Sequence, residues 1–382
     1  MSTVITAPRD ENDWVGYERV AARSFGKSTR NTAMFREHGL TRLVLDGGQV
    51  IAGATALLAH QYFGGRAVPA GCVSLVCVSP EHRGNGLAAR LIADLVAQMR
   101  SYGCLVASLW TPSTGVYRRW GWEVTGVGRR WVLPTRALRT RPDAGYRVVP
   151  GLVPEVRTLH ERVAIRWDGP VRRPGWWWRW KYPSDSDHAV YRLVGSDDQV
   201  RGFVTYQPRL TEPWGHHIEV SECWAADSEA LLGLYDFLGG HATLSDQVTF
   251  TQAALPAMPS FLWRLDQHEA TEQGWYPWMM RMLDPEAALR ARGWPDGVSG
   301  ELELEIGAGK RISVKADGAR TTVSAGGTGQ IRIPEGEFVA WYAGALDAGR
   351  LRELAWPGAR TADIELMTAL VSGRGPWLPD TF

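Results

Sequence analysis

Apolar side chains follow two periods in the first third of the chain. Between residues 13 and 25 they recur every three or four positions, which predicts a helix. Two alternating runs, 41–46 and 49–58, are separated by Gly47-Gly48 and predict a hairpin. The same reasoning predicts a strand over 67–78, a helix over 87–99 and a strand over 104–110. This order indicates a mixed α/β fold.

The middle of the chain repeats a similar order. We expect helices over 152–166 and 228–239, a hairpin over 189–206 and a strand over 218–224. Residues 225–230, between that strand and the second helix, read AADSEA and contain neither glycine nor arginine. A phosphate group is therefore not expected there.

The last hundred residues have a different pattern. Strict alternation predicts short antiparallel strands, and a helical period follows it. The strands are expected over 300–306, 310–314, 320–325 and 329–333, and the helices over 335–343, 348–354 and 362–371.

The junction within residues 74–99 carries candidate chemistry. Val76 and Val78 end a strand, Pro80 breaks it, and Arg83-Gly84-Asn85-Gly86 leads into the amphipathic helix. Glycines let a ligand approach the backbone, and a helix N-terminus attracts anions through its free N–H groups and dipole. An ordinary strand-to-helix turn is the alternative interpretation. The combination predicts a phosphate site.

This junction resembles motif A of the GCN5-related N-acetyltransferases (GNAT), whose turn holds the pyrophosphate of acetyl-CoA. The resemblance implies acetyl-CoA as cosubstrate and no metal, with Val76 and Val78 pairing with the pantetheine arm. It implies that the pyrophosphate loop consists of Arg83, Gly84, Asn85, Gly86, Leu87 and Ala88.

A second segment, Tyr117 to Trp122, resembles the Tyr-x-x-aromatic-Gly-aromatic pattern that closes many GNAT domains. In that family the tyrosine protonates the departing CoA sulfur, and a phenol with a pKa of about 10 suits this task. Tyr117 is therefore the candidate general acid; a packed tyrosine without a chemical role is the alternative.

The end of the chain resembles the Eis (enhanced intracellular survival) family. Such enzymes finish on an aromatic residue whose α-carboxylate reaches the active site, and this chain finishes on Phe382. The resemblance implies that this carboxylate anchors and deprotonates an ammonium group. Relatives often carry a second basic residue where Gly84 stands, and an acid where Thr381 stands, with Asp380 here one position earlier. We expect Asp380 to contact substrate.

The same resemblance implies tandem GNAT folds followed by a sterol-carrier-like unit. The boundaries expected are 1–135 for the catalytic domain, 136–285 for a degenerate copy and 286–382 for the sterol-carrier-like unit.

Composition narrows the function classes. The 382 residues hold 42 Lys plus Arg against 41 Asp plus Glu, which argues against a nucleic-acid or anionic-membrane partner. The four cysteines show no metal spacing, and no apolar run suggests a leader or a membrane span. We therefore expect a cytoplasmic protein.

Three minor features favour structural interpretations. The five arginines within 129–141 suggest a solvated inter-domain linker. The tryptophans of 176–180 suggest core packing rather than a ligand cage. His217, Glu219 and Cys223 share a strand face but lie too far apart to hold one metal ion.

These observations predict direct acetyl transfer from acetyl-CoA to a primary amine of an aminoglycoside, polyamine, lysine-containing peptide or related natural product. Phe25, Leu75 and Trp110 are expected to shape the substrate pocket. A biosynthetic acyltransferase using a longer acyl-CoA, or a non-catalytic CoA- or lipid-binding protein, are the alternatives. By resemblance alone we expect a homo-oligomer, a hexamer.

Overall fold

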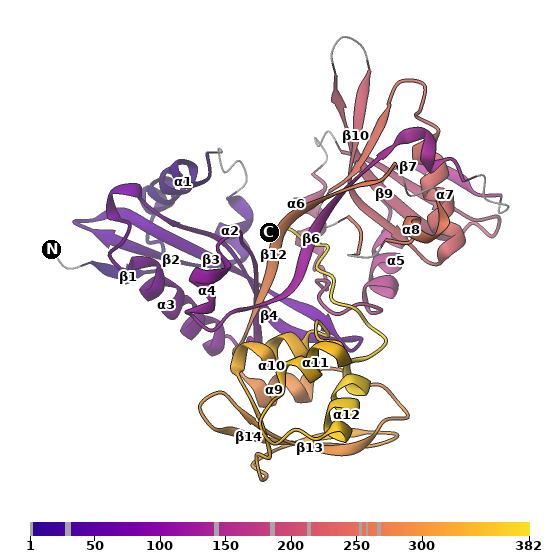
Figure 1. The fold of residues 1–382 in the computed structure, drawn as a ribbon. Coiled ribbons are helices and arrows are strands. Elements are labelled where there is room, and N and C mark those ends of the chain that lie inside the picture. Colours follow the sequence, from indigo (N-terminus) through magenta and orange to yellow (C-terminus); the bar gives the residue numbers. More distant parts are fainter. Residues whose placement is uncertain are drawn as a thin grey trace.

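Twelve strands of the first 282 residues form one continuous sheet (Figure 1). The computed structural model describes residues 3–26, 32–140, 145–183, 188–211, 215–251, 254–256, 259–265 and 269–382. In spatial order the strands are β1 (Val4–Thr6), β2 (Gly39–Asp46), β3 (Gln49–Phe63), β4 (Arg66–Val78), β5 (Val106–Trp110), β12 (Thr271–Met282), β6 (Glu123–Pro134), β11 (Gln247–Phe250), β10 (His216–Ala225), β9 (Val200–Leu210), β8 (Ala189–Val194) and β7 (Arg147–Pro150).

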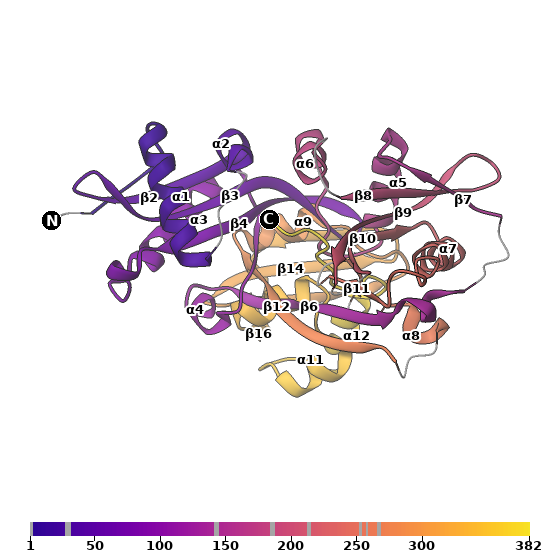
Figure 2. The same ribbon diagram turned by 90° about the horizontal axis from the view of Figure 1, so that it is seen from above.

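Two strands cross from one half of this sheet to the other. β12 follows the second half in sequence, yet it lies between β5 and β6 and is antiparallel to both. β6 in turn pairs with β11 of the second half. Figures 1 and 2 show β6 and β12 running side by side between the halves. The second half therefore contributes β12 to the sheet of the first half, and the first half contributes β6 to the sheet of the second.

The expectation of a solvated linker over 129–141 is wrong for its described part. Residues up to Pro134 belong to β6, and η2 (Thr135–Leu138) follows; Arg141 lies outside the described residues. Trp131 and Leu133 are buried, while Arg129 forms an ion pair with Glu272. Arg129 and Arg130 are consecutive, half-buried residues of β6, and Arg130 pairs with Glu219 of β10.

Helices cover both faces of the first half. α1 (Glu11–Phe25) packs with Leu43, and α3 (Leu87–Ser101) packs with Val44. Because the side chains of adjacent strand residues point to opposite faces, the two helices cover opposite faces of the sheet. The amphipathic helix predicted over 87–99 is confirmed, because the large apolar side chains from Leu87 to Met99 are buried along one face. The other helices before residue 285 are α2 (Ala33–His38), η1 (Pro80–His82), α4 (Thr114–Arg118), α5 (Pro154–Ala164), α6 (Gly175–Lys181), α7 (Ser228–Gly239) and α8 (Phe261–Arg264).

The C-terminal unit has its own sheet, ordered β15 (Thr321–Ala325), β14 (Lys310–Asp317), β13 (Ser299–Ile306) and β16 (Ile331–Ile333). β16 is parallel to β13, so the expectation of antiparallel strands is wrong for this pair. The reason is that the chain crosses over after β15 instead of forming a third hairpin. The helices of the unit are α9 (Pro285–Ala291), α10 (Glu335–Tyr342), α11 (Ala348–Leu354) and α12 (Thr361–Val371).

The C-terminal unit shares a core with the first half. One apolar cluster contains Phe63 and Trp278 of the large sheet together with Phe338 and Tyr342 of α10. After α12 the chain leaves this unit and returns to the centre, where the C-terminus lies between the halves in both views (Figures 1 and 2). The shared core fixes the start of this terminal segment relative to the large sheet.

Two general expectations can be compared with the described residues. All four cysteines are buried and free. None of the helices in the described ranges has the length and apolar character needed to cross a bilayer.

Candidate active site

β4 and β5 are parallel neighbours that separate after a short paired stretch. They pair only over Ala70–Cys72 and Val106–Ser108, although β4 continues to Val78. A bulge lies beyond this point, where Leu75 has a φ of 49° and the register against β3 shifts. The edge of β4 that carries Val76 and Val78 therefore has backbone groups without a partner on β5. An amide-containing chain has room to pair with such an edge as an added strand.

The turn after β4 exposes the first N–H groups of α3. Gly84 and Gly86 have φ values of 83° and 71°, in the left-handed region that favours glycine. No other atom lies within 4 Å of a Cβ built at either position, so the backbone is open to a ligand. No side chain caps the helix at Gly86. These are the features of an anion site at a helix N-terminus.

The remaining predicted loop residues lie around this turn. Arg83 is exposed, and its Nε donates to the carbonyl oxygen of Val78 at 3.3 Å. The Asn85 side chain donates to the carbonyl of His82 at 3.4 Å. Leu87 is buried and Ala88 half-buried at the start of α3. The loop is therefore held to the end of β4 while its N–H groups stay open.

Tyr117 lies on α4, after the end of β5. Its half-buried ring packs edge-on against Trp120 and Trp122, with ring centroids 5.3 and 6.0 Å away. Burial raises the pKa of Tyr117 to about 12, and the nearby Cys77 thiol of β4 adds to the shift. The phenol is therefore protonated at neutral pH and able to donate a proton.

The terminal segment reaches the end of β5. The Trp110 indole N–H donates to the carbonyl oxygen of Asp380 at 3.0 Å. Two residues span at most about 7 Å, so Phe382 lies within that distance of the Asp380 backbone that Trp110 holds. The Phe382 ring packs edge-on against Trp177 of α6, with centroids 6.2 Å apart. The end of the chain is therefore anchored by the Phe382 ring and by the backbone of Asp380.

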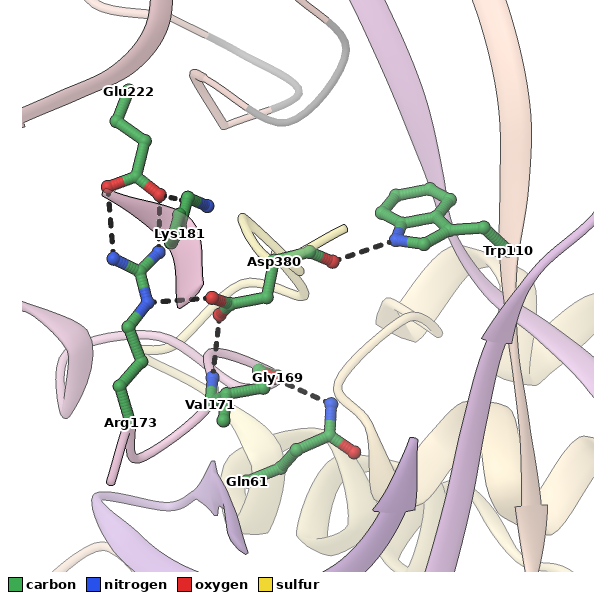
Figure 3. A network of polar contacts seen from close by, with 8 residues as sticks. All are labelled: Gln61, Trp110, Gly169, Val171, Arg173, Lys181, Glu222 and Asp380. Carbon is green, nitrogen blue, oxygen red and sulfur yellow. Dashed lines mark hydrogen bonds and ion pairs between the residues drawn. The ribbon is translucent and has the colours of Figure 1, made fainter. Parts of the chain in front are cut away.

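A buried ionic network fixes this segment (Figure 3). The Asp380 carboxylate accepts from the Val171 N–H at 3.0 Å and from Arg173 Nε at 2.7 Å. Arg173 also pairs with Glu222 of β10, which Lys181 contacts as well. Arg173, Glu222 and Asp380 are fully buried or nearly so, and the four charges cancel. Their attraction lowers the pKa of Glu222 far below its usual range despite burial.

This network corrects the expectation for Asp380. Both of its carboxylate oxygens accept from protein donors, and the residue is 0 % exposed. Asp380 therefore anchors the terminal segment and does not present its charge to a substrate. The missed partner is Arg173, because no sequence spacing relates residues 207 positions apart.

A chain of neutral hydrogen bonds continues from this network into the first half. Gln61 Nε2 donates to the Gly169 carbonyl at 2.7 Å, and Ser108 Oγ donates to Gln61 Oε1 at 2.7 Å. The Trp278 indole then donates to Ser108 Oγ at 3.2 Å. The segment that holds Asp380 is thus also tied to β3, β5 and β12.

The three predicted pocket residues do not all meet. Leu75 lies on the bulge of β4, and Trp110 ends β5 against Trp275, with centroids 5.1 Å apart. Both therefore flank the opening between the strands. Phe25 ends α1 with 48 % of its surface exposed and belongs to none of the buried clusters. Nothing in the described contacts brings Phe25 to the other two.

The described ranges contain no cluster of three or more His, Cys, Asp or Glu side chains arranged to hold a metal ion. Two of the three residues that the sequence analysis considered and rejected as metal ligands have other partners. His217 contacts Asp246, and Glu219 pairs with Arg130 and Arg209. Both strand residues therefore have acidic or basic neighbours within the protein.

Comparison with known proteins shows which family this chain matches. The acetyltransferase (GNAT) domain matches twice, over residues 7–125 and 169–282. An uncharacterized N-acetyltransferase from Streptomyces avermitilis is 30% identical over 84% of this chain and 82% of its own length. N-acetyltransferase Eis from Mycobacterium tuberculosis is 26% identical over 96% of both chains.

Solved structures show the same fold over the full length. A GCN5-related N-acetyltransferase from Anabaena variabilis aligns with a TM-score of 0.89 at 22% identity and covers 100% of both chains. Eis1 from Mycobacterium abscessus aligns with a TM-score of 0.81 at 23% identity, again over 100% of both chains. With two acetyltransferase domains and these relatives, the chain belongs to the Eis-like GNAT N-acetyltransferases and is an acyltransferase.

Proposed function

We propose that the enzyme transfers an acetyl group from acetyl-CoA directly to a primary amine. The observation that supports this proposal best is the hydrogen bond from Trp110 to the Asp380 carbonyl, which holds the terminal segment at the end of β5 two residues before Phe382. An aminoglycoside, a polyamine, a lysine-containing peptide or a related natural product would supply the amine.

The residues around the opening divide the work of binding the cosubstrate. The open N–H groups after Gly84 and Gly86 would receive the pyrophosphate, with the α3 dipole favouring its charge. The edge at Val76 and Val78, which has no partner on β5, would accept the amides of the pantetheine arm. A backbone N–H near Val78 would polarise the thioester carbonyl.

Two groups would handle the protons. The Phe382 carboxylate would bind the ammonium form of the acceptor and take up its proton, since only the neutral amine attacks the thioester. The amine nitrogen then forms a bond to the carbonyl carbon, and the C–S bond breaks. Tyr117 would deliver its proton to the leaving thiolate, which is consistent with its raised pKa.

Two changes test these roles. Tyr117→Phe removes the acid, and a glycine added after Phe382 moves the carboxylate by about 3.5 Å while it keeps the aromatic ring. We expect each change to lower kcat at least about tenfold, because a positioned acid or base typically contributes about a hundredfold or more. The affinity for CoA should change little. Tyr102→Phe is the matched control, because Tyr102 is 64 % exposed after α3. Free CoA release, measured with a thiol reagent, is the readout.

Normal turnover in the glycine-extended enzyme would refute the carboxylate role. Mass spectrometry of products from acetyl- and longer acyl-CoAs, with aminoglycosides, polyamines and lysine peptides as acceptors, identifies both substrates. Binding of CoA without acyl transfer to any acceptor in the panel would instead favour a ligand-binding protein.

We further propose that residues 286–382 form a sterol-carrier-like unit and that 1–135 and 136–285 are the two GNAT domains. A separate four-stranded sheet with α12 packed on β13 supports the first assignment. The exchange of β12 means that the two GNAT domains would not separate cleanly at these boundaries. A homo-oligomer, a hexamer by resemblance, stays a prediction.

A further inference from the structure

The second GNAT half contains a cavity of about 390 Å³ where β10 ends and α7 begins. Its volume lies within the range of small-molecule sites. α7 and α8 line it together with the terminal segment, and Figure 1 shows these two helices beside each other. The lining side chains used below are Trp167, Trp224, Leu231, Trp263 and Trp377.

This cavity occupies the place that corresponds to the opening between β4 and β5. β10 and β11 are parallel and pair only over Ile218–Val220 and Val248–Phe250, while β10 continues past a bulge to Ala225. α7 then follows β10 as α3 follows β4. The second half has therefore kept the diverging strands of the first half.

The anion site has been lost at this position. The Asp227 carboxylate caps α7 by accepting from the Ala230 N–H at 2.9 Å, so it occupies the helix N-terminus with a negative charge. A phosphate group would be repelled there. A second CoA is therefore not the ligand.

Among the residues that the structure describes, the lining is largely aromatic and carries no net charge. Trp377 packs against Trp224 and Trp167, with centroids 4.8 and 5.4 Å away. The two lining charges, Arg166 and Asp227, cancel, and Arg166 already donates to the Ala226 carbonyl at 2.6 Å. Trp263 of α8 stands at the cavity with 70 % of its surface exposed, an unusual state for so large an apolar side chain.

We propose that this cavity binds a neutral, planar aromatic small molecule. Flat rings match the edge-to-face and offset geometries that tryptophans prefer, and a neutral ligand suits a lining without net charge. The exposed Trp263 ring gains an apolar partner when the ligand binds. The proposal does not depend on acetyl transfer at the first site.

Indole and 2-naphthol are suitable probes, with ligand-observed NMR and titration calorimetry on the full chain as readouts. We expect saturable binding with Kd below about 1 mM, equivalent to about 4 kcal/mol. Leu231→Trp fills the cavity from α7 and should weaken binding at least tenfold. Leu232→Trp is the matched control, since the next helical position is rotated by about 100° and does not line the cavity.

Trp263→Ala provides a second variant that does not enlarge a side chain, and it should weaken binding at least threefold. CoA affinity and circular dichroism report folding for all variants. Absence of saturable binding to the wild-type chain, equal binding by the Leu231→Trp and wild-type chains, or competition by CoA would each overturn the proposal. Tighter binding of benzoate or benzyltrimethylammonium than of the neutral probes would overturn the neutral assignment.

Discussion

The Trp110 indole and the Asp380 carbonyl form a hydrogen bond of 3.0 Å between residues 270 positions apart. Trp110 ends the strand that forms one side of the candidate acyl-CoA opening, and Asp380 lies two residues before the C-terminus. The bond therefore connects the fold of the first half with the position of the last carboxylate. Loss of this bond should affect chemistry more than binding of CoA.

Trp110→Phe tests this connection. Phenylalanine keeps an aromatic ring beside Trp275 but cannot donate to Asp380. We expect kcat to fall about tenfold, roughly the 1.4 kcal/mol worth of one good hydrogen bond, with the KM for acetyl-CoA almost unchanged. Combining the change with the added glycine after Phe382 should give less than the sum of both effects, because they act on one element. Additive effects in steady-state kinetics would contradict the connection.

Asp380→Asn should destabilise the whole fold. The change leaves Arg173 with one carboxylate partner instead of two in a buried site. Breaking such a network typically costs about 3 kcal/mol, visible in the free energy of unfolding from denaturant titration. Glu353→Gln is the control, since its 67% exposed side chain pairs with Arg350 on the surface and should matter by less than about 0.5 kcal/mol. A variant with wild-type stability and only a raised acceptor KM would restore the original expectation that Asp380 binds substrate.

Local structure was predictable where one period governed the sequence. α3 and α7 follow the apolar spacing closely, and β3 begins at the expected residue although it continues five residues beyond Leu58. The position of β12 was not predictable, because strand pairing across the halves depends on partners far away in sequence. The arginines of β6 were misinterpreted for the same reason, because their acidic partners are distant in sequence: Glu272 lies on β12 and Glu219 on β10.

The candidate site likewise contains features that the sequence predicted and features that it did not. The glycine loop was recognisable because its residues are contiguous and each has a local conformational reason. The anchoring of Phe382 was expected only by resemblance, and its physical basis involves Trp110, Trp177 and Arg173 from three separate segments. Burial of the Asp380 charge depends on these partners, so sequence alone left it looking like an exposed acid.

Gly86→Ala should weaken acetyl-CoA binding. Its φ of 71° costs an L-residue about 1 kcal/mol, and the relaxed backbone would turn N–H groups away from the phosphate. We expect the KM for acetyl-CoA to rise about fivefold or more, in line with about 1 kcal/mol of lost interaction. Gly103→Ala is the matched control, because Gly103 has a φ of 80° and open space at the other end of α3. Equal KM changes in both variants would attribute the effect to general strain.

The pH dependence of kcat should lack a falling limb at moderately alkaline pH. Since the pKa of Tyr117 is raised to about 12, the acid stays protonated while the acceptor amine loses its proton. The rate should rise with pH and hold a plateau to at least pH 10. The profile of Tyr117→Phe should be lower throughout, with the same rising limb. A wild-type decline with a midpoint near 10 would indicate a phenol with an ordinary pKa.

Asp168 should make stability depend on pH in the direction opposite to most carboxylates. Burial raises its pKa to about 6, although Arg292 lies 3.6 Å away, the Gly64 N–H donates to it and Arg374 also lowers the pKa. Because the folded pKa exceeds the unfolded value, the native state binds more protons between about pH 4 and 6, and stability falls as pH rises through this window. The total approaches 3 kcal/mol, from about two units at roughly 1.4 kcal/mol each.

Asp168→Asn should remove this contribution, because asparagine keeps an acceptor for Gly64 but does not ionise. Thermal unfolding of both proteins at pH 4 to 8 should show the variant gaining stability relative to wild type as pH rises through 6, with the difference levelling off at about pH 7. Asp363→Asn is the control of opposite sign, since bonds from Arg360 lower the Asp363 pKa and its ionised form stabilises the fold. Parallel curves for wild type and Asp168→Asn would mean that Asp168 ionises normally in the folded protein.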